Sequence, residues 1–191
     1  HTDLSEKAPT DPAGEECGGP IHALFSCAGV ADGTPGIEKI NFIGHRYMID
    51  RLLAKDALPR GAAFGMISSA AGMGWEANLE SILELLEIDD FDAAAAWCQE
   101  HERVGYVPSK QQMGAYVASR ALPLLKRGIR INCIMPGPTN TPLAQANAEQ
   151  WLGFGADYRE EAGIEAATPM EQAYPLVFLC SDAAAGVTGI T

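Results

Sequence analysis

The string Tyr106-Val107-Pro108-Ser109-Lys110 combines residue types and a spacing that are suited to proton transfer. If a helix begins here, its first and fifth residues lie one turn apart on the same face, and the proline is tolerated because the first turn needs no N–H partner. A lysine ammonium beside a phenol favours the phenolate, so we expect Lys110 to lower the pKa of Tyr106 from its usual value near 10. The pair is therefore suited to general acid and base catalysis. A surface lysine beside a half-buried tyrosine is the alternative, and the string taken alone favours that alternative.

Small and polar residues follow three apolar segments of the chain. They are Cys27-Ala28-Gly29, Ser68-Ser69 after Ile67, and Pro136-Gly137-Pro138-Thr139-Asn140-Thr141. In open parallel sheets, ligands bind at the carboxyl ends of the strands. The hydroxyls and backbone amides of the third segment suit phosphate or amide groups. We therefore expect the three segments to line one crevice.

The elements that must position these residues alternate between strand and helix. Short apolar runs without strict alternation predict strands buried on both faces, as in parallel sheets. Apolar residues at three- and four-residue steps predict helices between them, so the chain reads as an α/β protein with helices on both faces of a parallel sheet. The predicted strands are residues 21–26, 62–67, 130–135 and an incipient one at 187–191, and the main predicted helices are 37–53 and 108–126.

The sequence marks the start of one further helix. Thr168 as N-cap, Pro169 at the first helical position and Glu171 three residues after the cap form a capping-box pattern. This helix is expected to end near Asp182.

A strongly acidic stretch at about 75–103 interrupts the alternation. It is predicted to form two helices, 76–86 and 91–102. One interpretation is a solvated acidic face, which is what charge runs usually form. The other is that its apolar side cups a substrate or a neighbouring subunit. That side comprises Leu83, Leu86, Phe91 and Trp97.

The composition excludes several classes of protein. Apolar residues make up 47% of the 191 positions, which fits one folded domain over 1–191, and the formal net charge of −12 argues against nucleic-acid and anionic-membrane partners. No apolar run approaches the ~18 residues of a membrane span. The five cysteines lack a CxxC pair and the histidines lack ligand spacing, which predicts no metal site and a reducing, cytoplasmic location.

Taken in order, five features resemble the short-chain dehydrogenase/reductase family along nearly the whole chain. They are Cys-Ala-Gly at 27–29, Asn41 in a helix, Ile-Ser-Ser at 67–69, Tyr-x-x-x-Lys at 106–110, and Pro-Gly-x-Thr-x-Thr at 136–141. The resemblance implies a doubly wound Rossmann-type sheet. It also implies NAD(P)-dependent interconversion of a secondary alcohol and a ketone, with NAD as the expected cofactor and NADP as the alternative. A homo-oligomer is expected on the same ground.

The resemblance also assigns roles to residues. Tyr106 would donate and accept the proton, Lys110 would lower its pKa and hold the nicotinamide ribose, and Ser69 would hold the substrate oxygen. Asn41 would anchor a water relay behind Lys110. The implied cofactor contacts are Asp3, Leu4, Cys27, Ala28, Gly29, Ile67, Tyr106, Lys110, Pro136, Gly137, Thr139 and Thr141.

The sequence departs from the family pattern in two ways. The acidic insertion lengthens the chain between Ser69 and Tyr106, which resembles the branch of bacterial 3α-hydroxysteroid dehydrogenase/carbonyl reductase and implies a bulky hydrophobic alcohol or ketone. The glycine-rich turn Thr-Gly-x-x-x-Gly-x-Gly does not occur. We therefore expect the domain to be incomplete at both ends, and a non-catalytic scaffold with a Rossmann-like fold is the alternative function. Residues 140–163, with Trp151 and Phe154, are either a lid or a packed surface loop.

Overall fold

The computed structural model describes residues 3–7 and 18–191 and contains a parallel three-stranded sheet. The strands β1 (Ala23–Ser26), β2 (Ala63–Ile67) and β3 (Arg130–Ile134) pair in the order β1-β2-β3. Strands β2 and β3 are buried along their length up to their last residue, which explains why their sequences do not alternate between apolar and polar residues. The strand predictions at 21–26, 62–67 and 130–135 are confirmed to within two residues.

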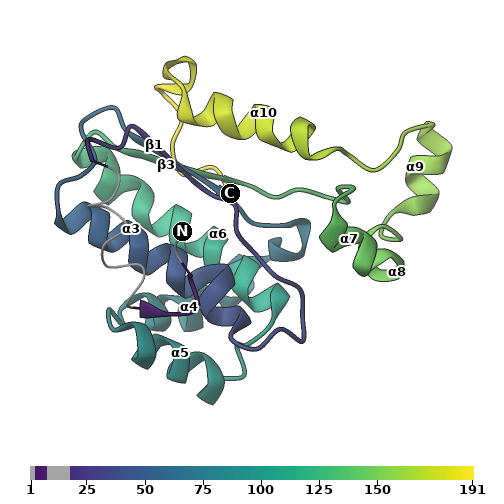
Figure 1. The fold of residues 1–191 in the computed structure, drawn as a ribbon, viewed down its shortest axis with the longest axis horizontal. Helices are drawn as coiled ribbons and strands as arrows, with labels where there is room; N and C mark the ends of the chain where they lie inside the picture. The colour runs from purple at the N-terminus through teal and green to yellow at the C-terminus, as the bar shows by residue number, and fades with distance from the viewer. Residues whose placement is uncertain (1–2, 8–17) are drawn as a thin grey trace.

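Helices cover both faces of this sheet, as predicted (Figure 1). Helices α3 (Gly44–Ala54) and α6 (Tyr106–Lys126) lie on one side, and α10 (Pro169–Cys180) lies on the other. A glycine in β2 allows α10 to approach closely, because a Cβ at Gly65 would lie 2.8 Å from the Cys180 sulfur. The predicted capping box of Thr168 and Glu171 is present at the start of α10.

Residues 187–191 were predicted to form a strand, and the structure corrects this. The segment lies beside β3, and the Gly189 N–H donates to the Ile131 carbonyl at 2.7 Å. The Ile131 N–H, however, donates to the Thr188 hydroxyl at 3.1 Å rather than to a carbonyl. A side chain thus takes the place of a ladder partner, and no regular strand pairing forms.

The acidic insertion folds as two helices, α4 (Leu79–Leu86) and α5 (Phe91–Glu100), after a 3₁₀ turn, η3 (Trp75–Asn78). Leu86 and Phe91 are buried in the central core, and the Phe91 ring meets the Tyr47 ring edge-on at 5.6 Å. Leu86 and Phe91 therefore pack inside the chain instead of cupping a substrate or subunit. The reason is that α4 packs on α6, which turns these two side chains toward the chain's own core, whereas Leu83 of the same predicted side stays exposed and Trp97 is partly buried.

The chain between β3 and α10 makes an excursion of three short helices, α7 (Pro142–Ala146), α8 (Ala148–Trp151) and α9 (Ala156–Ala162) (Figure 1). The base of this excursion is closed by a bridge between Thr139 and Ala167. No helix of the described ranges is both long and apolar enough to cross a bilayer.

Candidate active site

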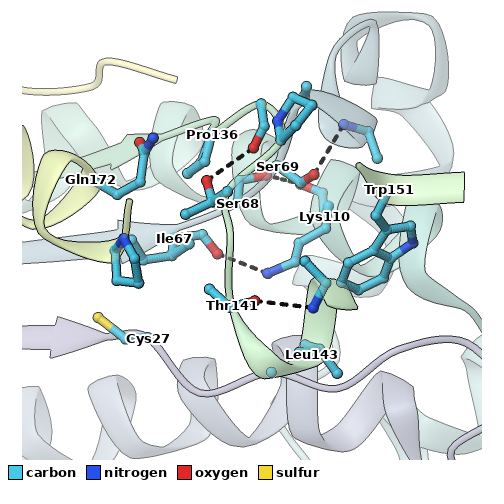
Figure 2. A pocket seen from close by; sticks show the side chains of 18 of the residues that line it. Cys27, Ile67, Ser68, Ser69, Lys110, Pro136, Thr141, Leu143, Trp151 and Gln172 are labelled. Atoms are coloured by element: carbon cyan, nitrogen blue, oxygen red, sulfur yellow. Dashed lines mark hydrogen bonds between the residues drawn. The ribbon is translucent and has the colours of Figure 1, made fainter. Parts of the chain in front are cut away.

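A cavity of about 720 Å³ opens at the carboxyl ends of the three strands (Figure 2). Its size falls within the usual range of small-molecule sites. Its walls come from the ends of β1 and β2, the start of α6, the loop after β3, the α7–α9 excursion and α10. The predicted site residues that line it are Cys27, Gly29, Ile67, Ser69, Tyr106, Lys110, Pro136, Gly137, Thr139 and Thr141.

Tyr106, Lys110 and Ser69 meet in this cavity. Helix α6 begins at Tyr106, so Lys110 follows one turn later, with its Nζ 5.5 Å from the centre of the Tyr106 ring. The Lys110 ammonium donates to the Ile67 carbonyl at 2.9 Å (Figure 2). Ser69 lies just beyond β2 and lines the same cavity, where its side chain lowers the pKa of the Tyr106 phenol. The predicted crevice therefore brings the three side chains together.

The electrostatics of the pair differ from the prediction. Burial raises the pKa of Tyr106, the hydrogen bond from Ser69 lowers it, and the Asp32 carboxylate raises it, so the net shift is upward. Burial also lowers the pKa of Lys110 to about 8. The expected acidification of the phenol by Lys110 is thus wrong for this structure, because burial dominates the pKa of Tyr106 and the Lys110 ammonium is bonded to the Ile67 carbonyl.

Asn41 lies behind the cavity rather than in its wall. It sits in a π-helical turn, η1 (Lys39–Ile43), where the pattern predicted an ordinary helix. Its side-chain carbonyl accepts from the Val30 N–H at 2.8 Å, and its amide donates to the Val30 carbonyl at 3.0 Å and to the Ser109 hydroxyl at 3.2 Å. Single π turns often mark functional sites, but nothing in the sequence indicates this one.

Three predicted cofactor contacts lie outside the cavity wall. Asp3 is exposed and accepts a hydrogen bond from the Ser5 hydroxyl. Leu4 is buried against α3, so close that a Cβ at Gly44 would come 2.3 Å from the Leu4 carbonyl oxygen. The Ala28 carbonyl lies 3.0 Å from His45 Nε2, a ring nitrogen at the buried side of α3. The roles of these residues toward a cofactor remain predictions.

Several residues of the wall were not among the predicted catalytic and cofactor-binding residues, although Trp151 and Phe154 were predicted to belong to a lid or a packed loop. Asp32 accepts a hydrogen bond from the Tyr106 N–H at 2.6 Å, although the two are far apart in the chain. Trp151, on α8, lies with its ring centre 4.7 Å from that of Tyr106, and Phe154 lines the same wall. Residues 140–163 therefore contribute an aromatic wall to the cavity. Gln172, Leu176 and Val177 add a side from α10 that no local motif signalled.

The residues of the cavity fit the nicotinamide and ribose of a dinucleotide. A lysine ammonium has three donors, and the hydrogen bond to Ile67 accounts for one of them among the described residues. At Gly137 an added Cβ would meet nothing within 4 Å, so this part of the wall stays open. The ranges that the structure describes hold no cluster of three or more His, Cys, Asp or Glu side chains that is suited to a metal ion.

Comparisons with known proteins agree with this geometry. A family model described as enoyl-(acyl carrier protein) reductase matches residues 87–191. The chain is 26% identical to coniferyl-alcohol dehydrogenase of Pseudomonas sp. (98% of this chain, 75% of that protein) and 30% identical to 3-alpha-hydroxysteroid dehydrogenase/carbonyl reductase of Comamonas testosteroni (91% and 71%). Among solved structures, the fold is similar to that of 3-alpha-hydroxysteroid dehydrogenase from Pseudomonas sp. B-0831 in complex with NADH, with a TM-score of 0.77 at 24% identity, covering 100% of this chain and 79% of that one.

Proposed function

Because the chain belongs to the short-chain dehydrogenase/reductase family of NAD(P)-dependent oxidoreductases, we propose that its cavity interconverts a secondary alcohol and a ketone, with Tyr106 as general acid and base. The observation that carries this proposal is the convergence of Tyr106, Ser69 and Lys110 on one cavity at the strand ends. A cytoplasmic location and a homo-oligomer accompany the proposal as predictions from the sequence.

Each polar side chain has a distinct task in the proposed reaction. The Ser69 hydroxyl holds the alcohol oxygen, and Tyr106 takes the hydroxyl proton during oxidation or returns it during ketone reduction. Lys110 holds a ribose hydroxyl with the donors that its hydrogen bond to the Ile67 carbonyl leaves over. A bound nicotinamide supplies the acceptor for the hydride that leaves the carbinol carbon. Since the pKa of Tyr106 is raised, the phenol is protonated at neutral pH, which favours ketone reduction there and alcohol oxidation at alkaline pH.

The substrate that we propose is an alcohol on a bulky hydrophobic ring. Trp151, Phe154 and Leu143 give the cavity a broad apolar wall beside Tyr106. Apolar side chains bind rings by burying their surface, and a few polar groups then fix the orientation. The name of one relative described above, 3-alpha-hydroxysteroid dehydrogenase/carbonyl reductase, supports the same class of substrate.

The test is turnover by the Tyr106→Phe variant. We expect the wild type to reduce NAD⁺ or NADP⁺ with a cyclic secondary alcohol, followed by absorbance at 340 nm, and the variant to lose about 10²- to 10⁴-fold in kcat. Tyr158→Phe is the matched control, because Tyr158 lies on α9 and is 70% exposed. A variant that keeps more than about a tenth of the wild-type kcat would contradict the role of Tyr106. A wild type without turnover of any alcohol, with either cofactor, would favour the non-catalytic scaffold.

A further inference from the structure

The Asp32 carboxylate reaches the first residue of α6 from the loop that follows β1. Its Oδ1 accepts the Tyr106 N–H at 2.6 Å. The helix has no side-chain cap of its own, because its N-cap is Gly105. Gly105 has φ 140°, which L side chains rarely adopt, and an added Cβ would come 3.3 Å from that carboxylate oxygen. Asp32 thus supplies, from a distant part of the chain, a side-chain acceptor to a helix N-terminus whose own N-cap residue has none.

The loop after β1 also helps to hold the carbonyl group of Tyr106, through Asn41 and Ser109. The Tyr106 carbonyl accepts from the Ser109 hydroxyl at 2.7 Å, and that hydroxyl accepts from the Asn41 amide. Asn41 in turn holds both backbone groups of Val30, two residues before Asp32. The segment from Val30 to Asp32 is therefore tied to both ends of the Tyr106 backbone.

We propose that Asp32 is a positioning residue for Tyr106, which fixes its backbone at the start of α6 and keeps a negative charge beside its phenol. The inference rests on the proposed function of Tyr106. Asp32 is exposed and lines the cavity, so its removal leaves the core intact. The titratable groups that share this part of the cavity with Tyr106 are Asp32 from the loop, Lys110 from α6 and Cys27 from the end of β1. Of these, Asp32 carries the negative charge, which disfavours the phenolate.

An ordinary helix cap is the competing explanation, since a carboxylate at a helix N-terminus stabilises the helix whatever its first residue does. Asp90 provides the matched comparison. It caps α5, where its Oδ1 accepts from the N–H groups of Asp92 at 3.1 Å and Ala93 at 2.9 Å, and it lies outside the cavity wall. Both aspartates place a carboxylate at a helix N-terminus, but Asp90 is the local N-cap of a helix away from the phenol, whereas Asp32 accepts the first N–H of α6 from a distant loop.

The first experiment measures the titration of Tyr106 directly. Tyrosine labelled with ¹³C at Cζ gives one NMR signal for each ring, and Tyr106→Phe assigns the relevant one. We expect Asp32→Asn to move the titration midpoint of Tyr106 down by roughly half a pH unit and Asp90→Asn to leave it unchanged. Asp32→Glu retains the charge and should keep the titration midpoint of Tyr106 near its wild-type value. Asp32→Ser gives a second neutral cap if the asparagine variant does not fold. An unchanged midpoint in the folded neutral variants overturns the inference.

The second experiment separates this inference from the proposed function. With an alcohol and cofactor, Asp32→Asn should shift the acidic limb of the kcat/KM profile to lower pH. Asp32→Ala should lower kcat about tenfold and leave KM nearly unchanged. If the wild type shows no turnover but the NMR midpoint moves as expected, the proposed function fails and the placement of Asp32 stands. If the wild type is active and neither the midpoint nor the pH profile responds, Asp32 is only a helix cap.

Discussion

Lys110 is the residue of the cavity whose ionisation is most affected by folding. Its side chain is buried, and burial lowers its pKa from 10.5 to about 8. A lysine with this pKa is still mainly charged at neutral pH, as the proposed role requires. Burying the charged ammonium lowers the free energy of unfolding. The hydrogen bond to the Ile67 carbonyl offsets part of that cost.

This cost predicts a pH dependence of stability. Between pH 8 and 10 the unfolded state binds the Lys110 proton and the folded state does not, so the free energy of unfolding should rise with pH over this window. Below pH 8 the full cost of the buried charge is present. We expect the difference between wild type and Lys110→Met to change by about 2 kcal/mol from pH 8 to pH 10, measured by urea denaturation. Lys126→Met, an exposed position at the end of the same helix, is the control. A difference that stays flat across the window would contradict the lowered pKa.

At the scale of residues, the sequence predicted which side chains meet in the cavity, but it did not predict the direction in which the pKa of Tyr106 shifts. The spacing of Tyr106 and Lys110 and the position of Ser69 after a strand are local patterns, and the structure places all three in one cavity. The direction of the Tyr106 pKa depends on burial and on Asp32, which arrives from a loop far away in the chain. No local pattern contains that information.

At the scale of elements, Arg46 connects helix α3 to the acidic insertion. Its side chain is buried at 3% exposure, and its guanidinium donates to the carbonyls of Leu85 at 2.9 Å and Ile88 at 2.6 Å. The Leu85 carbonyl lies in the last turn of α4 and also accepts from the Ile88 N–H at 3.1 Å, and the Ile88 carbonyl lies two residues beyond the helix, where no intrahelical donor is available. Ion pairs to Asp50 and Asp89 complete its contacts. The insertion is therefore held by a buried cation as well as by apolar packing.

We expect Arg46→Met to lower the free energy of unfolding by about 3 kcal/mol, because it removes the guanidinium donor of the Ile88 carbonyl, one of two donors to the Leu85 carbonyl, and the partner of two carboxylates. Hydrogen exchange should increase first in α4 and α5. Arg127→Met is the control: it removes an exposed ion pair with Asp56 at 2.9 Å and an exposed hydrogen bond to the Leu53 carbonyl at 3.0 Å, and should cost under about 1 kcal/mol. Equal losses for the two variants, measured by urea denaturation, would show that Arg46 contributes no more than a surface arginine.

The elements themselves could be predicted where their signals are local. The capping box at Thr168 and the continuous apolar runs of β2 and β3 are examples. The π turn at Asn41 and the irregular course of 187–191 could not, because they depend on partners elsewhere. At residues 187–191, the Thr188 hydroxyl takes a backbone donor of β3 that a strand would have used.

At the scale of the whole molecule, the cavity exists only because distant segments meet. The strand ends supply its polar floor, α6 supplies the pair of Tyr106 and Lys110, and the α7–α9 excursion supplies Trp151 as an apolar wall. Burying apolar surface contributes about 25 cal/mol per Å², so about 50 Å² of contact with an indole ring gives about 1.3 kcal/mol, or roughly tenfold in affinity. The ring of a bound cyclic alcohol would lie beside Trp151, whereas a short open-chain alcohol would reach Tyr106 with little contact to it.

Because Trp151 contacts the ring of the substrate and Tyr106 transfers the proton, Trp151→Ala should affect cyclic alcohols selectively. We expect KM for a cyclic secondary alcohol such as cyclohexanol to rise roughly tenfold with little change in kcat, because the lost contact contributes to binding and not to proton transfer. For 2-propanol, both constants should stay within about twofold. Tyr158→Ala, an exposed aromatic on the same excursion, should affect neither alcohol. If Trp151→Ala instead lowers kcat equally for both alcohols, Trp151 acts by orienting the Tyr106 ring, 4.7 Å away, and the wall does not select the substrate.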